Sequence, residues 1–358
     1  MSRPERARRQ EQENASPEVR EVAPGVLRLQ LPIQFTGLGH VNSYCLLDKR
    51  GAAVVDAGLP GPDTWKAIRQ RLGSAELRVR DVHTVIVTHS HPDHFGSAEL
   101  LAKKAGAELV AERSFHTWLE RPAPGEDNAY VRMARTGRTP WGGRPFEWGQ
   151  RQKIANKLAR HGLNPYLRRP EPTRRLSDGD EMVLAGRRWR ALHTPGHTGD
   201  HLCLFDDEAG VLLSGDHVLP TITPHVGGIT PLSDPLGEFC ASLGRLLELG
   251  PVAQVLPAHG HPFSDLPARV GQILDHHDER LIALRKAAGE LGKATVSDLS
   301  HRLFPERLWG MMAESETYAH LEFLRLRGEA ERAFEGEELV YLLDSGGSAS
   351  ARSTAFGH

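Results

Sequence analysis

The sequence predicts an α/β protein built from alternating strands and helices. Short apolar runs bounded by Gly, Asp and Pro are typical of strands, and segments with apolar residues at helical spacing lie between them. Hydrophobic residues make up 39% of the chain and charged residues 25%, which is the composition of a globular protein. The length of 358 residues suggests two domains, or one large domain with an appendage.

The first domain is expected over residues 22–270. Residues 1–21 contain almost no large apolar side chain and many charges, so we expect a disordered tail there. The pattern then predicts strands over 26–31, 43–47, 52–55, 84–87 and 108–111, with helices over 62–72 and 97–104. Further strands are predicted over 181–184, 188–192, 201–205, 211–214 and 252–256.

Between these two sets of strands, residues 113–175 form an insertion of different composition. The segment holds 14 Lys and Arg residues against 5 Asp and Glu residues, within a chain whose net charge is −2. Its periodic parts predict helices over 128–136 and 150–162. A basic segment of this kind either attracts an anionic ligand or is plain solvated surface.

The second module is expected over residues 271–343. Helices over 275–289, 295–303 and 314–326 precede a hairpin over 330–334 and 339–342, and this order resembles a winged-helix module. The last of these helices and the hairpin are rich in Glu, so binding of nucleic acid is not expected. Packing or formation of a homodimer is the preferred role. Residues 344–358 are rich in Gly, Ser and Ala and are expected to form a flexible tail.

Composition also excludes several classes of protein. The three cysteines, Cys45, Cys203 and Cys240, have no CxxC spacing, so neither a disulfide scaffold nor a thiolate zinc ribbon is expected. No run approaches the ~20 apolar residues that span a bilayer, and the N-terminal charges are not followed by an apolar segment. We therefore expect a cytoplasmic protein without a membrane partner.

The strongest chemical signal is the run Thr88-His-Ser-His-Pro-Asp-His94. Its ligand types are His89, His91, Asp93 and His94, directly after a predicted strand. Imidazole and carboxylate groups at this spacing are suited to binding divalent metal ions. Continued strand geometry would direct His89 and His91 the same way, and the following helix would turn Asp93 and His94 toward a second point.

Four more polar residues follow predicted strands. Asp56 ends the strand over 52–55, His197 follows 188–192, Asp216 follows 211–214 and His259 follows 252–256. Any one of them alone would more often be a turn residue. Because loops after strands converge at one edge of an α/β sheet, all four together with the histidine run predict a metal site.

These motifs together resemble the metallo-β-lactamase-fold hydrolase superfamily, over about residues 22–265, with a dinuclear set like that of glyoxalase II. The resemblance implies a four-layer αβ/βα sandwich and two divalent ions, with zinc expected and iron or manganese also suited. One ion would be held by His89, His91 and His197, and the other by Asp93, His94 and His259. Asp216 would bridge them, Asp56 would steady the ligand loop, and His201 would support a ligand or the substrate.

The resemblance also narrows the chemistry. The best-known dinuclear β-lactamases have Cys where this chain has Asp216, which disfavours antibiotic hydrolysis. A hydroxide between two ions would attack the substrate, with Asp93 aiming it. We expect hydrolysis of a small, anionic ester, thioester or lactone. Insertions at 113–175 lie over the metal cleft in this fold, so Arg168 and Arg169 are candidate substrate residues, as are His217 and His225. The alternatives are a metal-dependent ribonuclease or phosphodiesterase, and a regulatory protein with a structural metal.

Overall fold

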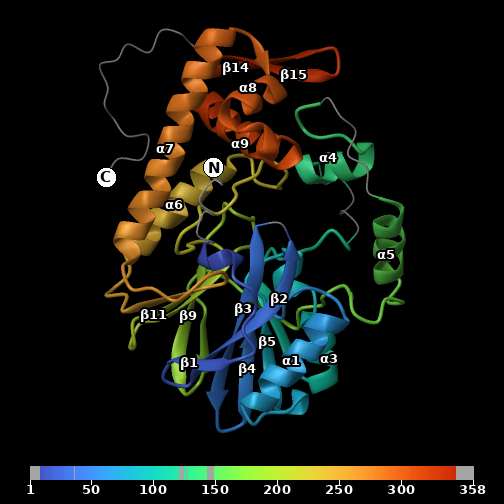
Figure 1. The fold of residues 1–358 in the computed structure, drawn as a ribbon, viewed down its shortest axis with the longest axis vertical. Helices are drawn as coiled ribbons and strands as arrows, with labels where there is room; N and C mark the ends of the chain where they lie inside the picture. The colour runs from blue at the N-terminus through green and yellow to red at the C-terminus, as the bar shows by residue number, and fades with distance from the viewer. Residues whose placement is uncertain (1–8, 36, 121–124, 126, 143–148, 344–358) are drawn as a thin grey trace, which may run out of the picture.

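Two β-sheets stacked face to face form the centre of the molecule, with helices on both outer faces (Figure 1). This computed structural model describes residues 9–35, 37–120, 125, 127–142 and 149–343. Helices α1 (Pro62–Ser74) and α3 (Ala98–Ala105) cover the first sheet. Helices α6 (Pro235–Leu247) and α7 (Leu266–Leu291) cover the second. The predicted α/β class and the four-layer arrangement are therefore confirmed.

The first sheet has seven strands in sequence order. Each of the first four strands pairs antiparallel with its neighbour. From the fourth strand to the seventh, each strand pairs in parallel with the next. The strands are β1 (Val19–Ala23), β2 (Val26–Phe35), β3 (Leu38–Asp48), β4 (Gly51–Val55), β5 (Val82–Ile86), β6 (Glu108–Glu112) and β7 (Arg174–Leu176). The parallel strands β4 and β5 end at the same edge of the sheet, which places Asp56 beside the histidine run.

The second sheet has five strands in the order β12-β11-β10-β9-β8. Its strands are β8 (Glu181–Leu184), β9 (Arg187–His193), β10 (Leu202–Asp206), β11 (Val211–Gly215) and β12 (Gln254–Pro257). Only β11 and β12 pair in parallel, so Asp216 and the loop after β12 also reach one edge. Apolar side chains of both sheets meet in a core around Trp189, which is 0% exposed. That core fixes the two ligand-bearing edges relative to each other.

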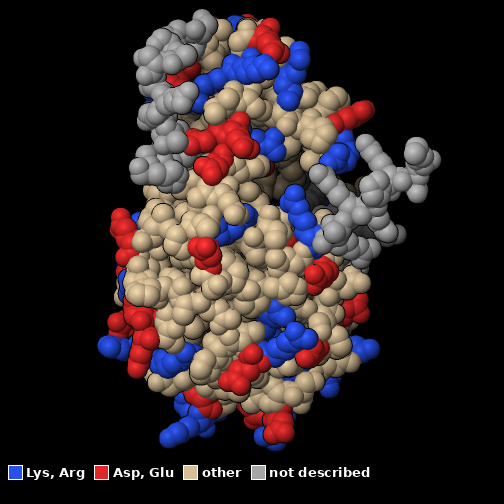
Figure 2. Space-filling view, turned by 60° about the vertical axis from the view of Figure 1, so that its left-hand side comes forward, with Lys and Arg blue, Asp and Glu red and all other residues tan. Residues whose placement is uncertain are grey.

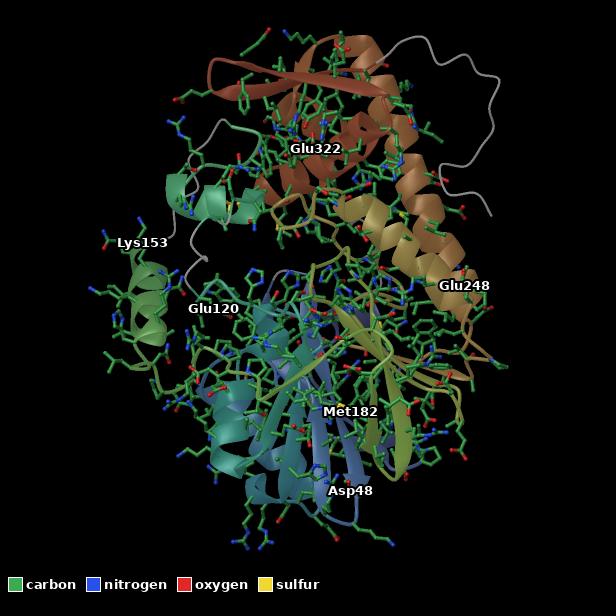
Figure 3. All side chains as sticks on the ribbon, turned by 180° about the vertical axis from the view of Figure 1, so that it is seen from behind. Asp48, Glu120, Lys153, Met182, Glu248 and Glu322 are labelled. Carbon is green, nitrogen blue, oxygen red and sulfur yellow. The ribbon has the colours of Figure 1, made fainter. Side chains whose placement is uncertain are left out.

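The C-terminal region comprises α7, β13 (Ala294–Thr295), α8 (Val296–Leu303), α9 (Met311–Leu326), β14 (Ala330–Glu335) and β15 (Glu338–Leu343). The three helices and the hairpin predicted here are confirmed. Helix α7 begins earlier than predicted, because Asp265 caps it by accepting a hydrogen bond from the Ala268 amide. The expected boundary at 270/271 thus falls inside one continuous helix. Figure 3 shows Glu322 of α9 in the interior of this region.

The N-terminal segment differs from the sequence prediction. Residues 9–21 were expected in a disordered tail, but residues 10–12 form a 3₁₀ turn and β1 begins at residue 19. The carboxylate of Glu11 is buried and accepts hydrogen bonds from the backbone amides of Thr221 and Ile222 and from the Thr221 hydroxyl. The prediction failed because a polar segment is held here by hydrogen bonds rather than by apolar burial. The tail predictions for 1–8 and 344–358 fall outside the described residues.

Several short or intervening elements escaped the sequence prediction, among them strand β7, the two-residue strand β13 and helix α6. The single turn α2 (Pro92–Phe95) contains Asp93 and His94, as expected for residues that turn from the strand onto a helix. Further 3₁₀ turns span Val79–Asp81 and Glu306–Leu308. Within the parts of the chain that are described, no helix is long and apolar enough to cross a membrane.

The insertion divides into two helices that contact different parts of the molecule. Helix α4 (Ala129–Thr136) leads to Trp141, which packs in the core of the C-terminal region and donates a hydrogen bond to Glu314. Helix α5 (Gln150–Arg160) lies at the outer edge of the molecule, where Lys153 is labelled in Figure 3. Basic and acidic side chains are intermixed on the face shown in Figure 2.

Candidate metal centre

The predicted ligand residues converge at one edge of the sandwich. The side chains form two groups, and within each group the ligand atoms all lie within 4.8 Å of one another. They are His89, His91, His197 and Asp216, and then Asp93, His94 and His259. Each residue comes from a loop or turn that follows a strand, as the sequence predicted.

Asp216 lies between the two groups. Its Oδ2 is 3.5 Å from Nε2 of both His94 and His197, and its Oδ1 is 3.3 Å from Nε2 of His259. Asp93 approaches the same atom of His259, with its Oδ2 3.5 Å from that Nε2. The carboxylate of Asp216 is thus placed to serve both groups at once.

Four of the five histidines have a fixed outer nitrogen. Nδ1 of His94 donates to Asp56 at 2.8 Å, and Nδ1 of His197 and His259 donate to the carbonyl oxygens of His225 and His40, both at 2.7 Å. Nδ1 of His89 lies 3.0 Å from the Thr88 hydroxyl. A proton held at Nδ1 leaves the Nε2 lone pair directed to the centre, which is how metal-binding histidines are generally oriented. His91 faces the others through Nδ1 instead.

Asp56 occupies a strained position that aims its carboxylate. Its φ of 59° lies in the left-handed region, which side chains other than Gly seldom adopt. From there it accepts hydrogen bonds from the Thr88 amide and hydroxyl, both at 2.9 Å, in addition to the one from His94. Such strain persists where surrounding contacts over-determine it, and it is common at functional sites.

The donor set fits divalent cations. Nε2 of His94, Nε2 of His259 and Oδ1 of Asp216 are buried and lack a hydrogen-bond partner within the described structure. Burial alone would lower the pKa of His94, but the carboxylates of Asp216, Asp56 and Asp93 outweigh burial and raise it well above its usual value. Conversely, His259 and His94 outweigh burial at Asp216 and hold its pKa well below the usual range. Positive charge is therefore strongly favoured at this point, as a cation would provide.

His201 supports the centre without facing it. Its Nε2 accepts a hydrogen bond from the Asp216 amide at 3.1 Å, and its Nδ1 pairs with the Thr194 hydroxyl at 2.8 Å. The ring is fully buried, and Gly215 is required beside it because a Cβ there would lie 2.7 Å from Nε2. His201 therefore fixes the backbone from which Asp216 projects.

The predicted substrate residues differ in whether they line the cavity over the centre. His225 lines the cavity described below, but His217 is 0% exposed and packs against Phe239, so its predicted contact with substrate is wrong. Burial lowers the pKa of His217 to about 3 and keeps it neutral. Arg168 and Arg169 are absent from the described cavity lining, and Arg169 pairs with Glu171 at the surface. Among the described residues of the insertion, the cavity lining includes only Ser114, His116, Thr117 and Trp118.

A cavity of 1110 Å³ opens over the centre. Asp93, His91, His197, Asp216 and His259 form part of its lining. Apolar side chains from the 219–232 loop and from α9 line much of the rest, namely Leu219, Ile222, Pro224, Ile229, Leu232, Met311 and Met312. No Lys or Arg is present in the lining formed by the described residues. This volume of 1110 Å³ slightly exceeds the ~300–1,000 Å³ of small-molecule sites.

Several residues of the site were not predicted. Thr88 lies within the histidine run, so its place before His89 was the only available signal. His40 and the carbonyl of His225 had none, because they act across separations of 219 and 28 residues. Glu316 is similar, since it reaches His225 from α9, with 3.4 Å between its Oε2 and Nδ1.

Comparisons with known proteins agree with this geometry. A family model described as "Metallo-beta-lactamase superfamily" matches residues 36–288. The chain is 26% identical over 331 residues to a Bacillus subtilis (strain 168) protein named "Probable metallo-hydrolase YqjP", covering 88% of this chain and 97% of that one. It is 33% identical over 172 residues to an "Atrochrysone carboxyl ACP thioesterase" of Aspergillus chevalieri, covering 45% and 52%. A crystal structure of a metallo-beta-lactamase family protein from Thermus thermophilus has a TM-score of 0.70 and 30% identity, covering 90% and 100%.

Proposed function

Since this chain belongs to the metallo-beta-lactamase superfamily and is a metal-dependent hydrolase, we propose that it cleaves a thioester, ester or lactone with an uncharged, apolar acyl group. The main support is the position of Asp216 between two groups of ligand side chains at the base of an apolar cavity. A relative named as an acyl carrier protein thioesterase supports the thioester as the first choice among these bonds.

Two divalent ions would occupy the two groups. His89, His91 and His197 would hold one ion, Asp93, His94 and His259 the other, and Asp216 both. Such ions, when bound, supply the Lewis acidity that makes water nucleophilic near neutral pH and polarises a carbonyl. Zinc suits this set of imidazoles and carboxylates, as do iron and manganese.

The chain's own residues orient and exclude water. A carboxylate oxygen of Asp93 faces the cavity, where it accepts a hydrogen bond from the attacking water and then holds the proton that the water loses. That proton can return to the departing thiol or alcohol. The apolar side chains of the 219–232 loop and α9 keep bulk water away from the acyl group.

A substrate with an uncharged acyl group replaces the anionic substrate expected from the sequence. That expectation depended on the basic insertion, yet the described cavity lining contains neither Lys nor Arg. Long-range attraction by surface charge is screened over a Debye length of about 8–10 Å at physiological salt. We therefore expect kcat/KM to change little with salt.

The ribonuclease alternative has less support. In that reading α9 would present basic side chains to a phosphate backbone, but most of α9 is buried. Its acidic residues are engaged inside the protein, with Glu322 contacting Arg325, Arg332 and Tyr341. A purely structural metal site is also disfavoured, because a structural site has no need of an open cavity.

The test combines metal analysis with a substrate panel. We expect about two ions per chain, and hydrolysis of apolar thioesters faster than that of phosphodiesters or short RNA. Asp216→Ala should lose at least one ion and all turnover, whereas Asp207→Ala, which removes an exposed partner of Arg190, should retain both. Two tightly bound ions in Asp216→Ala, or cleavage of RNA alone, would overturn the proposal.

A further inference from the structure

Part of the positive charge of the insertion lies on helix α5, which the proposed function does not use. Residues 150–163 include Arg151, Lys153, Lys157 and Arg160 and contain no Asp or Glu. Lys153 and Lys157 are exposed and make no ion pair within the described structure. Because no Lys or Arg is present in the described cavity lining, this charge does not contact a substrate inside the cavity.

The outward face of α5 is apolar as well as basic. Ile154 and Leu158 are four residues apart, so they are neighbours on the helix surface, and they are 57% and 40% exposed. The helix buries Asn156 and Ala159 instead. A surface helix of a globular protein normally turns its apolar stripe toward the core. An apolar stripe that faces outward is therefore typical of a helix that binds a partner.

A basic row lies beside this apolar row. Lys153 and Lys157 are also four residues apart, and each directly precedes one of the two apolar residues, Ile154 and Leu158. The exposed His161, at the end of the helix, continues the basic row by a further turn. A partner that matches this face presents carboxylates next to apolar side chains.

Helix α5 is anchored beside the cavity over the metal centre. Ala159 packs in the same core cluster as Phe95 and Phe115. Nη2 of Arg160 donates a hydrogen bond to the carbonyl oxygen of Trp118 at 3.0 Å, and Trp118 lines the cavity. The helix lies at the edge of the molecule, where a large partner can reach it (Figure 1). A partner bound to α5 is therefore close to the cavity.

Of the partners that a basic face can bind, an acidic protein fits best. Nucleic acid would place phosphates against Ile154 and Leu158, which form no favourable contact with them. Helices that lie in a membrane surface are often longer and carry aromatic residues, whereas α5 has 11 residues and none of them is aromatic. A helix of an acidic protein can pack against the apolar row and pair its carboxylates with the lysines.

We propose that the outward face of α5 docks an acidic protein that carries the acyl group as a thioester. Carboxylates of this carrier pair with Lys153 and Lys157, and its apolar side chains cover Ile154 and Leu158. The basic row also speeds the encounter by attracting the carrier. The proposal rests on the proposed function, because it takes a thioester as the substrate, and it adds that the thiol belongs to a protein.

Two substrates with the same acyl group test the proposal. One is the hexanoyl thioester of an acidic acyl carrier protein, and the other is the free thioester S-hexanoyl-N-acetylcysteamine. Raising NaCl from ~50 to ~500 mM should lower kcat/KM for the carrier roughly tenfold, because salt screens the docking charges. The free thioester meets only the cavity, so its kcat/KM should hardly change. Equal salt dependence for the two substrates would overturn the proposal.

Charge reversal locates the effect on α5. The double variant Lys153→Glu/Lys157→Glu should lower kcat/KM for the carrier by roughly tenfold or more. Its metal content and its kcat/KM for the free thioester should stay at wild-type values. Lys66→Glu/Arg69→Glu is the matched control, because it reverses two exposed charges on α1, which does not line the cavity. An equal loss in both double variants would mean that net charge, rather than α5, is responsible.

The apolar row is tested separately. Ile154→Ser/Leu158→Ser should lower kcat/KM for the carrier by about fivefold while the salt dependence remains. Both side chains are exposed, so the melting temperature should change little. Ile282→Ser, at a position 64% exposed on α7, is the control. An unchanged kcat/KM for the carrier in the double serine variant would overturn the docking face as proposed.

Binding separates the docking face from the proposed function. A carrier that bears a hexyl thioether cannot be hydrolysed, and calorimetry measures its affinity. If no thioester is cleaved, but the wild type binds this carrier about tenfold or more tightly than Lys153→Glu/Lys157→Glu does, the function is wrong and the docking face stands. If both thioesters are cleaved and the two proteins bind the carrier equally, the function stands and the docking face is wrong. Binding to phosphatidylglycerol vesicles but not to the carrier would identify a membrane-binding helix and overturn the proposal.

Discussion

At the scale of single residues, the centre depends on hydrogen bonds that orient each ligand. Asp56 is the clearest case, because one carboxylate fixes the start of the histidine run through Thr88 and one ligand ring through His94. Its left-handed backbone indicates that this contact is maintained against a local conformational cost. The sequence indicated the residue but not these three bonds.

We expect Asp56→Asn to weaken metal affinity by about 10–100-fold. Asn replaces one acceptor oxygen by an NH2 group, which only donates, and it faces groups that themselves donate, so at least one of the three hydrogen bonds is lost. Competition with a chromogenic chelator measures the change. Asp81→Asn, which alters an exposed partner of Arg78, is the control and should bind metal as the wild type does. Equal affinities for the two variants would reduce Asp56 to a turn residue.

Glu316 provides a second test at this scale, through pH. Burial would raise the pKa of this carboxyl, but His225, His320 and Arg280 outweigh burial and hold it at about 2, against an ordinary 4.5. A depressed pKa gives stability that is present above the unfolded value and lost as pH falls through the folded value. This stability is therefore complete above pH ~4.5 and disappears toward pH ~2, and it amounts to roughly 3 kcal/mol.

Glu316→Gln should therefore lower the free energy of unfolding near neutral pH by up to that amount. The difference from the wild type should shrink as pH falls below ~4.5, because the wild-type carboxylate is then being protonated. Urea unfolding at several pH values measures it. Glu331→Gln on the exposed face of β14 is the control and should show no such trend. A constant difference at every pH would mean that packing, rather than charge, is responsible.

At the scale of elements, the N-terminal segment acts as a strap across the site. Gln10 accepts a hydrogen bond from the His261 amide, and the Glu13 carbonyl accepts one from Nδ1 of His40. The carbonyl of His40 in turn orients His259. With Glu11 holding residues 221 and 222 of the cavity loop, this short segment connects two loops that border the metal centre.

Glu11→Ala should destabilise the protein by about 1–3 kcal/mol, because the donors of Thr221 and Ile222 lose their buried acceptor. Hydrogen exchange should accelerate at residues 221–222 before it does in the sheets. Glu18→Ala is the control, since Glu18 is exposed and paired only with Arg20. If exchange at 221–222 is unchanged in Glu11→Ala, the strap does not hold that loop.

At the scale of the whole molecule, the C-terminal region is part of the main structure. One apolar cluster joins Phe205 and Val255 of the second sheet to Phe239 of α6 and to Leu321 and Phe323 of α9. Helix α7 runs through both regions without interruption. Figure 1 shows the C-terminal helices seated over the end of the sandwich that holds the site. Because Met311 and Met312 also line the cavity, this region shapes the site as well.

A shared core predicts that the described structure unfolds as one unit. Leu321→Ala should cost about 2–5 kcal/mol, because it opens a cavity at a fully buried position. The transitions followed by circular dichroism and by tryptophan fluorescence should shift together. Leu326→Ala, at a position 45% exposed, should change stability little. Two separate transitions, with only one of them moved by Leu321→Ala, would show that the C-terminal region folds independently.

The sequence by itself determined the layered α/β fold and the ligand set. Strands, helices and the histidine run are local patterns, and ligands that follow parallel strands must meet at one sheet edge. Asp56, His197, Asp216 and His259 were recognisable because each ends or follows a strand. For the same reason, elements without apolar periodicity, such as the turn at 10–12 and the short strand β7, were not predicted.

Only the tertiary structure decided what surrounds the centre. Glu11 and Thr221 are 210 residues apart, and His40 and His259 are 219, so no local pattern links them. The sequence showed the positive charge of the insertion but not the position of that charge relative to the cavity. Arg168 and Arg169 lie outside the described cavity lining. His217 was misjudged because burial depends on the packing of Phe239 rather than on the residue type. The residue types of the ligands indicate metal chemistry, whereas the access of a substrate to the metal centre depends on long-range packing, which exists only in the folded chain.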